Sequence, residues 1–289
     1  MTTKSIKRFN IIKVNGETVA DTSDALAIEE PLEIRLEYGP SGERQVKNIS
    51  VTMRTPGNDA ELATGFLFTE GIVSSGEAIL NIAHSFISCA ENKENVVVVK
   101  LKEGIIPNLN SSERNFYTSS SCGVCGKGSI NAIRTVSSFA NRKEISHSID
   151  AQELYRLPDV LRYYQDAFAS TGGIHAAGLF NLAGELLLLR EDVGRHNALD
   201  KLIGEAINKN WLPLDNYILL LSGRASFELV QKAAMAGITI IAAVGAPSSL
   251  AVELAAEFNI TLVGFLRGQR FNIYTQPQRI LLPKYEDTY

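Results

Sequence analysis

Alternation of apolar and polar residues marks the first third of the chain as β-rich. Residues 32–38 read LEIRLEY, in which every second residue is apolar, as expected of a strand with one buried face. The turn YGPSG at 38–42 leads into a returning strand over 46–53, and residues 95–101 predict a further strand. We therefore expect the N-terminal part to be built of antiparallel strands.

One helix is expected among these strands. Residues 58–61 read NDAE, in which Asn58 can cap a helix while Glu61 reaches back towards it. The helix is expected to end near Gly71, because glycine commonly stops helices. Residues 102–114 show little periodicity and are interpreted as the crossing to a second unit.

The rest of the chain changes to a helical and then an alternating pattern. Residues 129–139 and 150–170 predict helices, the second interrupted at Pro158. A hairpin is expected over 174–180 and 185–190. Helices are then predicted at 197–207, 226–236 and 248–258, and strands at 217–222, 238–244 and 260–266.

This alternation predicts parallel strands with helices packed on the sheet, an α/β fold preceded by an α+β part. The predicted domains are a β-rich N-terminal unit with one or two helices, residues 1–114, and an α/β unit, residues 115–289. The second would carry the cysteine loop and the ligand site.

Composition restricts the possible partners. The 289 residues are 45% hydrophobic and 21% charged, with a net charge of −4, which gives no electrostatic reason to expect nucleic acid as the main partner. The longest apolar runs are too short to span a bilayer, and MTTKSIKRFN lacks the core of a signal peptide. We expect a cytoplasmic protein without membrane contact, and three cysteines favour reduced thiols over a disulfide framework.

Three segments follow the strands predicted at 217–222, 238–244 and 260–266. Parallel sheets bind ligands at the carboxyl ends of their strands, and helix N-termini and arginines there favour a phosphate-bearing ligand. If the three strands are neighbours, the segments converge. The candidate ligand-binding residues are Ser222, Gly223 and Arg224, then Ala246, Pro247 and Ser248, then Phe265, Leu266, Arg267, Gly268, Gln269 and Arg270.

Two histidines lie near these segments. His175 is in an apolar strand and His196 is where a helix begins, and both positions are more often structural than catalytic. Asp192 is available to orient a histidine or to pair with Arg195. Asp200 and Lys201 are expected on the exposed face of that helix, a position that would leave both side chains in water.

The segment SSSCGVCGKGS, residues 119–129, places Cys122 and Cys125 in a loop of small residues. It lacks the first glycine and the hydroxyl of a phosphate loop, and the chain lacks the His-x-Glu of zinc deaminases. No buried strand precedes it, as a thioredoxin-like dithiol would require. A sulfur carrier fits better, because Lys127 and a nearby helix start would favour the reactive thiolate. Cys89, by contrast, is expected to be a buried, unreactive thiol.

Several blocks together resemble one known family. They are RTPGNDAELATGFLFTEGI, SSCGVCGKGS, TGGIHAAGLF, REDVGRHNALDKLIG, SGRASFELVQKAAMAGI, APSSLAVELA and VGFLRGQRFNIYT, in that order along the chain from Met53. The chain is similar in them to the FdhD family, sulfurtransferases required for formate dehydrogenase activity. The first fifty residues match least.

The resemblance implies a specific activity. The protein would take sulfur from a cysteine desulfurase as a persulfide on Cys122, with Cys125 as its partner. It would pass that sulfur to the molybdenum (or tungsten) bis(molybdopterin guanine dinucleotide) cofactor before formate dehydrogenase receives it. Residues Phe265 to Arg270 would contact the cofactor, with GDP as a surrogate ligand. The family also implies a homodimer, no zinc, and a C-terminal domain resembling cytidine deaminase, a three-layer sandwich with a mixed sheet.

Two alternatives stay open. A non-covalent chaperone could bind the cofactor while the cysteines only gate its site. A zinc-dependent enzyme of deaminase type is the second.

Overall fold

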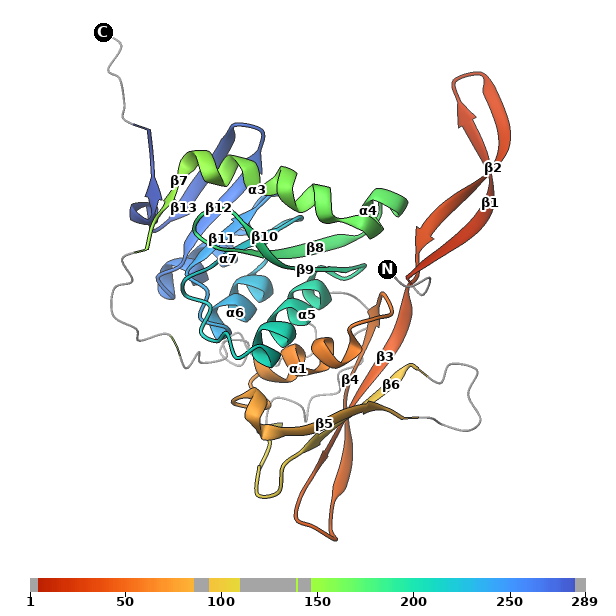
Figure 1. The fold of residues 1–289 in the computed structure, drawn as a ribbon, viewed down its shortest axis with the longest axis vertical. Coiled ribbons are helices and arrows are strands. Elements are labelled where there is room, and N and C mark those ends of the chain that lie inside the picture. The colour runs from red at the N-terminus through yellow and green to blue at the C-terminus, as the bar shows by residue number, and fades with distance from the viewer. Residues whose placement is uncertain (1–4, 86–93, 110–138, 140–146, 284–289) are drawn as a thin grey trace.

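A six-stranded mixed sheet forms the centre of the C-terminal part (Figure 1). The computed structural model of the chain describes residues 5–85, 94–109, 139 and 147–283. In spatial order the sheet contains β13 (Arg270–Thr275), β12 (Thr261–Arg267), β11 (Ile240–Ala243), β10 (Ile218–Leu221), β8 (His175–Phe180) and β9 (Leu186–Asp192). Strands β10, β11 and β12 are parallel neighbours, as predicted, and the other pairs are antiparallel.

Helices cover both faces of this sheet. Successive residues of its strands point to opposite faces, and apolar residues lie on both, so each face is buried under helices. Leu219 and Ile241 face α5 (Arg195–Asn208) and α6 (Phe227–Met235), whereas Leu220 and Ile240 belong to the core beneath α3 (Ala151–Tyr164). Helix α7 (Ser249–Glu257) packs beside α6. The predicted α/β class, with helices on both sides of a mixed sheet, is confirmed.

The N-terminal part has a sheet of its own. It contains β4 (Gln45–Arg54), β3 (Glu30–Tyr38), β6 (Val96–Leu101) and β5 (Ile79–His84), in that order, with a 3-10 turn at Gly76–Ala78 before β5. The expectation of purely antiparallel strands is wrong for one pair, since β3 and β6 are parallel. Helix α1 (Asp59–Thr69) lies between β4 and β5 in the chain, and this long connection allows β6 to run parallel to β3.

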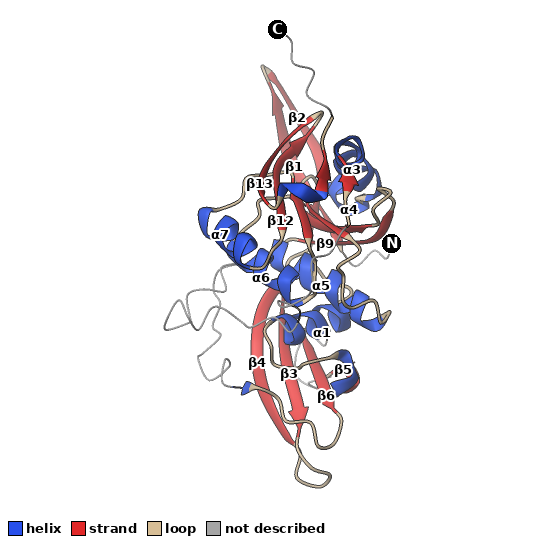
Figure 2. Ribbon diagram, turned by 90° about the vertical axis from the view of Figure 1, so that its left-hand side faces the viewer, coloured by secondary structure: helices blue, strands red, loops and turns tan. Residues whose placement is uncertain are grey.

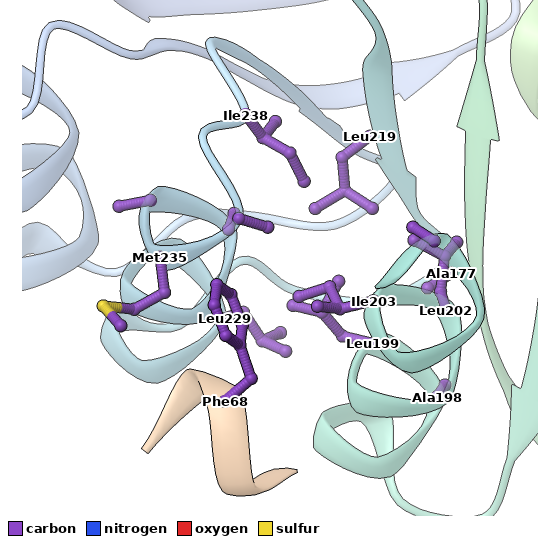
Figure 3. Packing of buried hydrophobic residues seen from close by; sticks show 14 of the residues in the cluster. Phe68, Ala177, Ala198, Leu199, Leu202, Ile203, Leu219, Leu229, Met235 and Ile238 are labelled. Carbon is purple, nitrogen blue, oxygen red and sulfur yellow. The ribbon is translucent and has the colours of Figure 1, made fainter. Parts of the chain in front are cut away.

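One continuous core joins the two sheets. Figure 2 shows α1 and α5 stacked between the four-stranded sheet and the six-stranded sheet. Phe68 of α1 packs in the same cluster as Leu199 and Ile203 of α5 and Leu229 of α6 (Figure 3). Ile34 of β3 belongs to this cluster as well and is completely buried.

Two local predictions about helices are corrected. Asn58 has a left-handed backbone (φ 59°) and makes no side-chain cap; its amide instead donates to Glu61 at 2.8 Å. Helix α3 runs through Pro158 and ends before Gln165, after which α4 (Asp166–Thr171) begins. The break falls there because the Glu191 carboxylate accepts the first free N–H groups of α4, from Ala167 and Phe168.

The remaining elements are small or peripheral. Strands β1 (Ile6–Asn15) and β2 (Thr18–Ala27) form a two-stranded ribbon, and β7 (Ile149–Asp150) pairs with β14 (Ile280–Leu281), which follows a 3-10 turn at Pro277–Arg279. The helix predicted at 129–139 lies outside the described residues, apart from its last position. Over the described ranges, every helix is too short or too polar to cross a bilayer.

Candidate functional site

The three predicted ligand segments meet at one edge of the central sheet. Strands β10, β11 and β12 are adjacent and parallel, so their carboxyl ends lie side by side (Figure 1). The Gly245 N–H donates to the Gly223 carbonyl at 3.0 Å, and the Phe265 N–H donates to the Gly245 carbonyl at 3.1 Å. Ala225 and Pro247 add an isolated parallel bridge. The expected convergence is confirmed for the backbone.

The first segment, Ser222 to Arg224, rests against β8. The Ala176 N–H donates to Ser222 Oγ at 2.8 Å, which fixes that hydroxyl. A Cβ added to Gly223 would lie 3.2 Å from Nδ1 of His175, so glycine lets the histidine ring approach the backbone. Arg224 follows and is exposed to solvent.

The N-terminus of α6 is already occupied by a carboxylate of the chain itself. Glu228, in the first turn, is contacted by its own N–H, by Ser226 and by His196, whose Nε2 lies 3.9 Å from the carboxylate. The approach of His196 is the largest influence and lowers the pKa of Glu228 to about 2. An incoming anion would have to compete with Glu228 there, so the helix dipole of α6 is a weaker attraction than the sequence suggested.

Segment Ala246 to Ser248 opens α7 with a side-chain cap. The Ala251 N–H donates to Ser248 Oγ at 3.2 Å. Ser248 is exposed, whereas Ala246 and Pro247 are half-buried between the neighbouring segments. One donor of this helix end is therefore satisfied within the chain.

The third segment is not a strand-to-helix loop but a bulged β-hairpin. Strand β12 continues to Arg267, and Arg267 pairs with Arg270 across the turn into β13. Phe265 has φ 57°, a left-handed conformation that is strained for a bulky residue, and its side chain is half-buried. Residues Arg267 to Arg270 are all exposed, and Leu266 between them and Phe265 is buried.

Three arginines leave this edge strongly basic. Within the described residues, no carboxylate lies close enough to form an ion pair with Arg224, Arg267 or Arg270. Exposed guanidinium groups without an internal counter-ion are suited to phosphate oxygens, to which arginine can donate two parallel hydrogen bonds. The edge therefore combines exposed cations with a half-buried aromatic ring.

The ring of His175 lies against Gly223 of the first segment. Burial lowers its pKa, and the charge of Arg195 lowers it further, so the ring is neutral at pH 7. Asp192, which was expected to orient a histidine or to pair with Arg195, lies opposite His175 in the β8–β9 pair, and its charge raises the pKa of that ring, against the larger effects of burial and Arg195. Its carboxylate is 2.7 Å from Nζ of Lys201 and accepts the Thr55 N–H at 3.1 Å.

Asp200 and Lys201 are buried, contrary to expectation. Asp200 lies 3.0 Å from Nζ of Lys232 and accepts the Thr69 hydroxyl at 2.8 Å. Burial alone would lower the pKa of Lys232, but the charges of Asp200 and Glu70 outweigh it and raise that pKa. The reason for the burial is that α1 and the residues just before it cover this side of α5: Thr69 of α1 contacts Asp200, and the Thr55 carbonyl, which follows β4, accepts a hydrogen bond from Lys201.

The cysteines lie outside the described residues, so the predictions made for Cys89, Cys122 and Cys125 stay predictions. The His196–Glu228 pair was missed in the sequence. The sequence shows Glu228 as an acid in the first turn of a predicted helix, but nothing in the spacing places His196 beside it.

Comparison with known proteins agrees with this architecture. The profile of the FdhD/NarQ family matches residues 27–281. Relatives named sulfur carrier protein FdhD include those of Streptomyces avermitilis (48% identical over 96% of both chains) and Mycobacterium tuberculosis (48% identical over 92% of this chain and 95% of the relative). The FdhD of Sulfolobus acidocaldarius is 43% identical, with 95% of this chain and 98% of the relative covered.

A crystal structure from Desulfotalea psychrophila, described as a formate dehydrogenase accessory protein, has the same fold. It matches with a TM-score of 0.71 and 24% identity, covering 96% of this chain and all of the other. The family profile and the three relatives extend over most of the chain, and the profile includes all three segments at the sheet edge. The chain belongs to the FdhD/NarQ family.

Proposed function

We propose that this protein is a sulfur carrier that takes sulfur from a cysteine desulfurase as a persulfide on Cys122. It passes that sulfur to the molybdenum bis(molybdopterin guanine dinucleotide) cofactor before the cofactor enters formate dehydrogenase. The protein acts as a cytoplasmic sulfurtransferase and works as a homodimer. Support comes from the names of its relatives and from the basic edge of the central sheet.

The observation that carries the proposal is the set of Arg224, Arg267 and Arg270 at one sheet edge. Each guanidinium is exposed, and among the described residues none has an acidic partner. The cofactor is the substrate here, and its guanine dinucleotide ends carry phosphates that these groups can bind. Phe265, half-buried beside them, offers an apolar surface on which a guanine base can stack.

Loading of sulfur needs no change of net oxidation state. The Cys122 thiolate attacks the outer sulfur of the desulfurase persulfide, and the S–S bond of that persulfide breaks. The desulfurase cysteine leaves as a thiolate, and Cys122 becomes the persulfide. Cys125, three positions further along the sequence, can then attack the Cys122 sulfur: the S–S bond of the persulfide breaks, hydrosulfide leaves, and a Cys122–Cys125 disulfide remains, which a cellular dithiol reduces before the next cycle.

Mass spectrometry tests this proposal directly. Incubation with a cysteine desulfurase and cysteine is expected to add one sulfur atom to a peptide containing Cys122, and Cys122→Ala is expected to lose that adduct. Cys89→Ala is the matched control and is expected to load normally. A protein that gains no sulfur on Cys122 or Cys125 would favour the non-covalent chaperone instead.

A further inference from the structure

A fourth segment of the chain reaches the sheet edge at which the three ligand segments meet. Strand β8 runs antiparallel to β10, so its first residue, His175, lies at the edge where β10 ends. Strand β9 ends at Asp192, which pairs with His175, and α5 begins three residues later at Arg195. The start of α5 therefore lies at the same edge as the ligand segments, on the β9 side of the sheet.

Arg195 has a guanidinium group that the fold leaves unpaired. Its side chain is half-buried, and its Nε is buried without a hydrogen-bond partner. Arg190, on the neighbouring strand β9, shows the usual arrangement, because its Nη2 donates to the Glu61 carboxylate at 3.0 Å. Buried N–H donors are nearly always paired in native proteins, so the free donor of Arg195 indicates an acceptor that the described chain does not supply.

Two carboxylates near the start of α5 have basic partners of their own. Asp192 is completely buried, and its carboxylate lies 2.7 Å from Nζ of Lys201. Glu228, in the first turn of α6, lies 3.9 Å from Nε2 of His196. Neither of these carboxylates, nor any other in the described ranges, forms an ion pair with Arg195. The positive charge of Arg195 is therefore available to an anion from outside the chain.

His175 supplies a second polar group beside Arg195. Its ring lies against the backbone of Gly223, where an added Cβ would be 3.2 Å from Nδ1. Burial and the charge of Arg195 lower the pKa of His175. The charge of Asp192 acts in the opposite direction, and that of His196 adds a smaller lowering. The ring is therefore neutral at pH 7 and carries one N–H, which can donate a hydrogen bond to an anion held by Arg195.

The N-terminus of α5 adds a dipole to these side chains. This helix has 14 residues, no side-chain cap on its first N–H groups and no acid in its first turn. At the same edge, α6 has Glu228 in its first turn and α7 is capped by Ser248. Of the three helix starts that are described here, only that of α5 is without a side-chain acceptor. Its dipole therefore reinforces the attraction of Arg195 for an anion.

We propose that Arg195 and His175 bind a tetrahedral oxyanion of the phosphate class at the start of α5, in what we term the β9 anion site. The guanidinium donates from Nε and from its terminal nitrogens, and the imidazole donates its single N–H. Strands β9 and β12 are four inter-strand steps apart, about 19 Å. The β9 anion site therefore holds a different anionic group from the one bound by Arg267 and Arg270.

NMR of the histidine rings in the full chain tests this site, with inorganic sulfate as the probe and chloride at equal ionic strength as the reference. Sulfate is a tetrahedral oxyanion whose charge stays constant while histidine titrates. An anion beside Arg195 opposes the charge that lowers the pKa of His175, so sulfate is expected to raise the proton affinity of that ring at least about threefold. His84, on β5 in the other sheet, is the internal reference and is expected not to respond. A His175 signal that titrates identically in sulfate and chloride would overturn the proposal.

Substitution of Arg195 separates this site from general salt effects. Arg195→Gln is expected to raise the pKa of His175 in chloride and to weaken sulfate binding at least about tenfold. Arg156→Gln is the matched control, because Arg156 is exposed on α3, pairs with Glu153 and is expected to behave as the wild type. An equal response to sulfate in Arg195→Gln and the wild type would contradict the assignment.

Arg195→Lys decides the question should Arg195→Gln fail to fold. It keeps the charge but lacks the Nε donor, so it is expected to bind sulfate at least about threefold more weakly than the wild type. Unchanged sulfate affinity in Arg195→Lys would remove the guanidinium from the site.

Competition with GDP distinguishes two sources of the anion, a nucleotide phosphate and a separate oxyanion. Sulfate is expected to stay bound at saturating GDP, because the β9 anion site and the β12–β13 turn are about 19 Å apart. Displacement by GDP but not by guanosine would assign the site to the phosphates of that nucleotide and overturn its separation from Arg267 and Arg270. The link to the cofactor rests on the proposed function, whereas sulfate binding does not. Persulfide loading at Cys122, measured by mass spectrometry, therefore reports separately on the proposed function.

Discussion

Gly65 of α1 and Gly204 of α5 face each other where the two helices cross. A Cβ added to Gly65 would lie 1.9 Å from the Asp200 carbonyl oxygen and 3.0 Å from the Gly204 nitrogen. A Cβ added to Gly204 would lie 1.9 Å from the Glu61 carbonyl oxygen. The two helix backbones are therefore in direct contact, and α1 can approach α5 this closely only because both positions are glycine.

Gly204→Ala is expected to destabilise the protein by at least about 3 kcal/mol, because the added methyl group meets backbone and the helices must separate. Urea unfolding followed by circular dichroism measures the change. Gly173→Ala is the control, since a Cβ there meets nothing closer than 3.8 Å. Equal stability of the two variants would show that the helix crossing can relax.

The α1–α5 crossing also explains where sequence reasoning failed. Asp200 and Lys201 lie on the polar side of α5 as judged from its own sequence, and they were expected in water. Helix α1 and the residues just before it cover that side, and they come from a segment more than a hundred residues earlier in the chain. Helical periodicity describes one helix and does not identify its neighbours, so the buried ion pairs could not be predicted.

Lys201→Met is expected to cost about 3–5 kcal/mol, because it leaves the buried Asp192 carboxylate without its cation. Thermal unfolding at neutral pH checks this. Lys209→Met provides the comparison. The side chain of Lys209 is 41% exposed, and its Nζ lies 3.3 Å from the Glu205 carboxylate. Removing this surface ion pair is expected to lower the free energy of unfolding by less than about 0.5 kcal/mol. A small effect at Lys201 would mean that Asp192 takes up a proton or finds another donor.

Glu228 is expected to make the protein sensitive to acid. Its pKa of about 2 in the folded state lies below the ordinary value of 4.5, so the carboxylate stabilises the fold above pH 4.5. That contribution, about 1–2 kcal/mol once solvent screening is taken into account, is lost as the pH falls from 4.5 to about 2. Glu228→Gln is expected to lower the melting temperature at pH 6 and to flatten its decline below pH 4.5. A parallel decline in both proteins would contradict the assigned pKa.

The sheet edge was predictable because its signals are local. Alternating strands and helices identify β10, β11 and β12, and parallel strands bring their carboxyl ends together whatever the loops contain. The conformation of the third segment was not predictable. Register across a hairpin and a left-handed Phe265 depend on contacts with Gly245 and β13, which no spacing along the chain reveals.

The side chain of Phe265 is expected to lower the stability of the fold and to strengthen nucleotide binding. A bulky residue in the left-handed region costs about 1–3 kcal/mol, a cost that glycine avoids. The free energy of unfolding of Phe265→Gly is therefore expected to lie within about 1 kcal/mol of the wild-type value. Phe265→Ala keeps the strain, so its free energy of unfolding is expected to be about 1 kcal/mol lower than that of the glycine variant. Both are expected to bind GDP at least about fivefold more weakly, because the stacking surface is gone. Unchanged GDP affinity in both would make the ring purely structural.

The arginines of the β12–β13 turn are expected to hold phosphate. Each charge-assisted hydrogen bond to a phosphate contributes about 1.5–3 kcal/mol, so Arg267→Ala with Arg270→Ala is expected to weaken GDP binding at least about tenfold in calorimetry. Both side chains are exposed and, within the described chain, lack an acidic partner, so the melting temperature is expected to stay unchanged. Arg156→Ala is the control, because Arg156 is an exposed arginine on α3 that pairs with Glu153.

Persulfide loading at Cys122 is expected to be normal in the double variant, since loading and delivery are separate steps. Equal GDP affinity in the wild type and the double variant would place the nucleotide site elsewhere than at this edge.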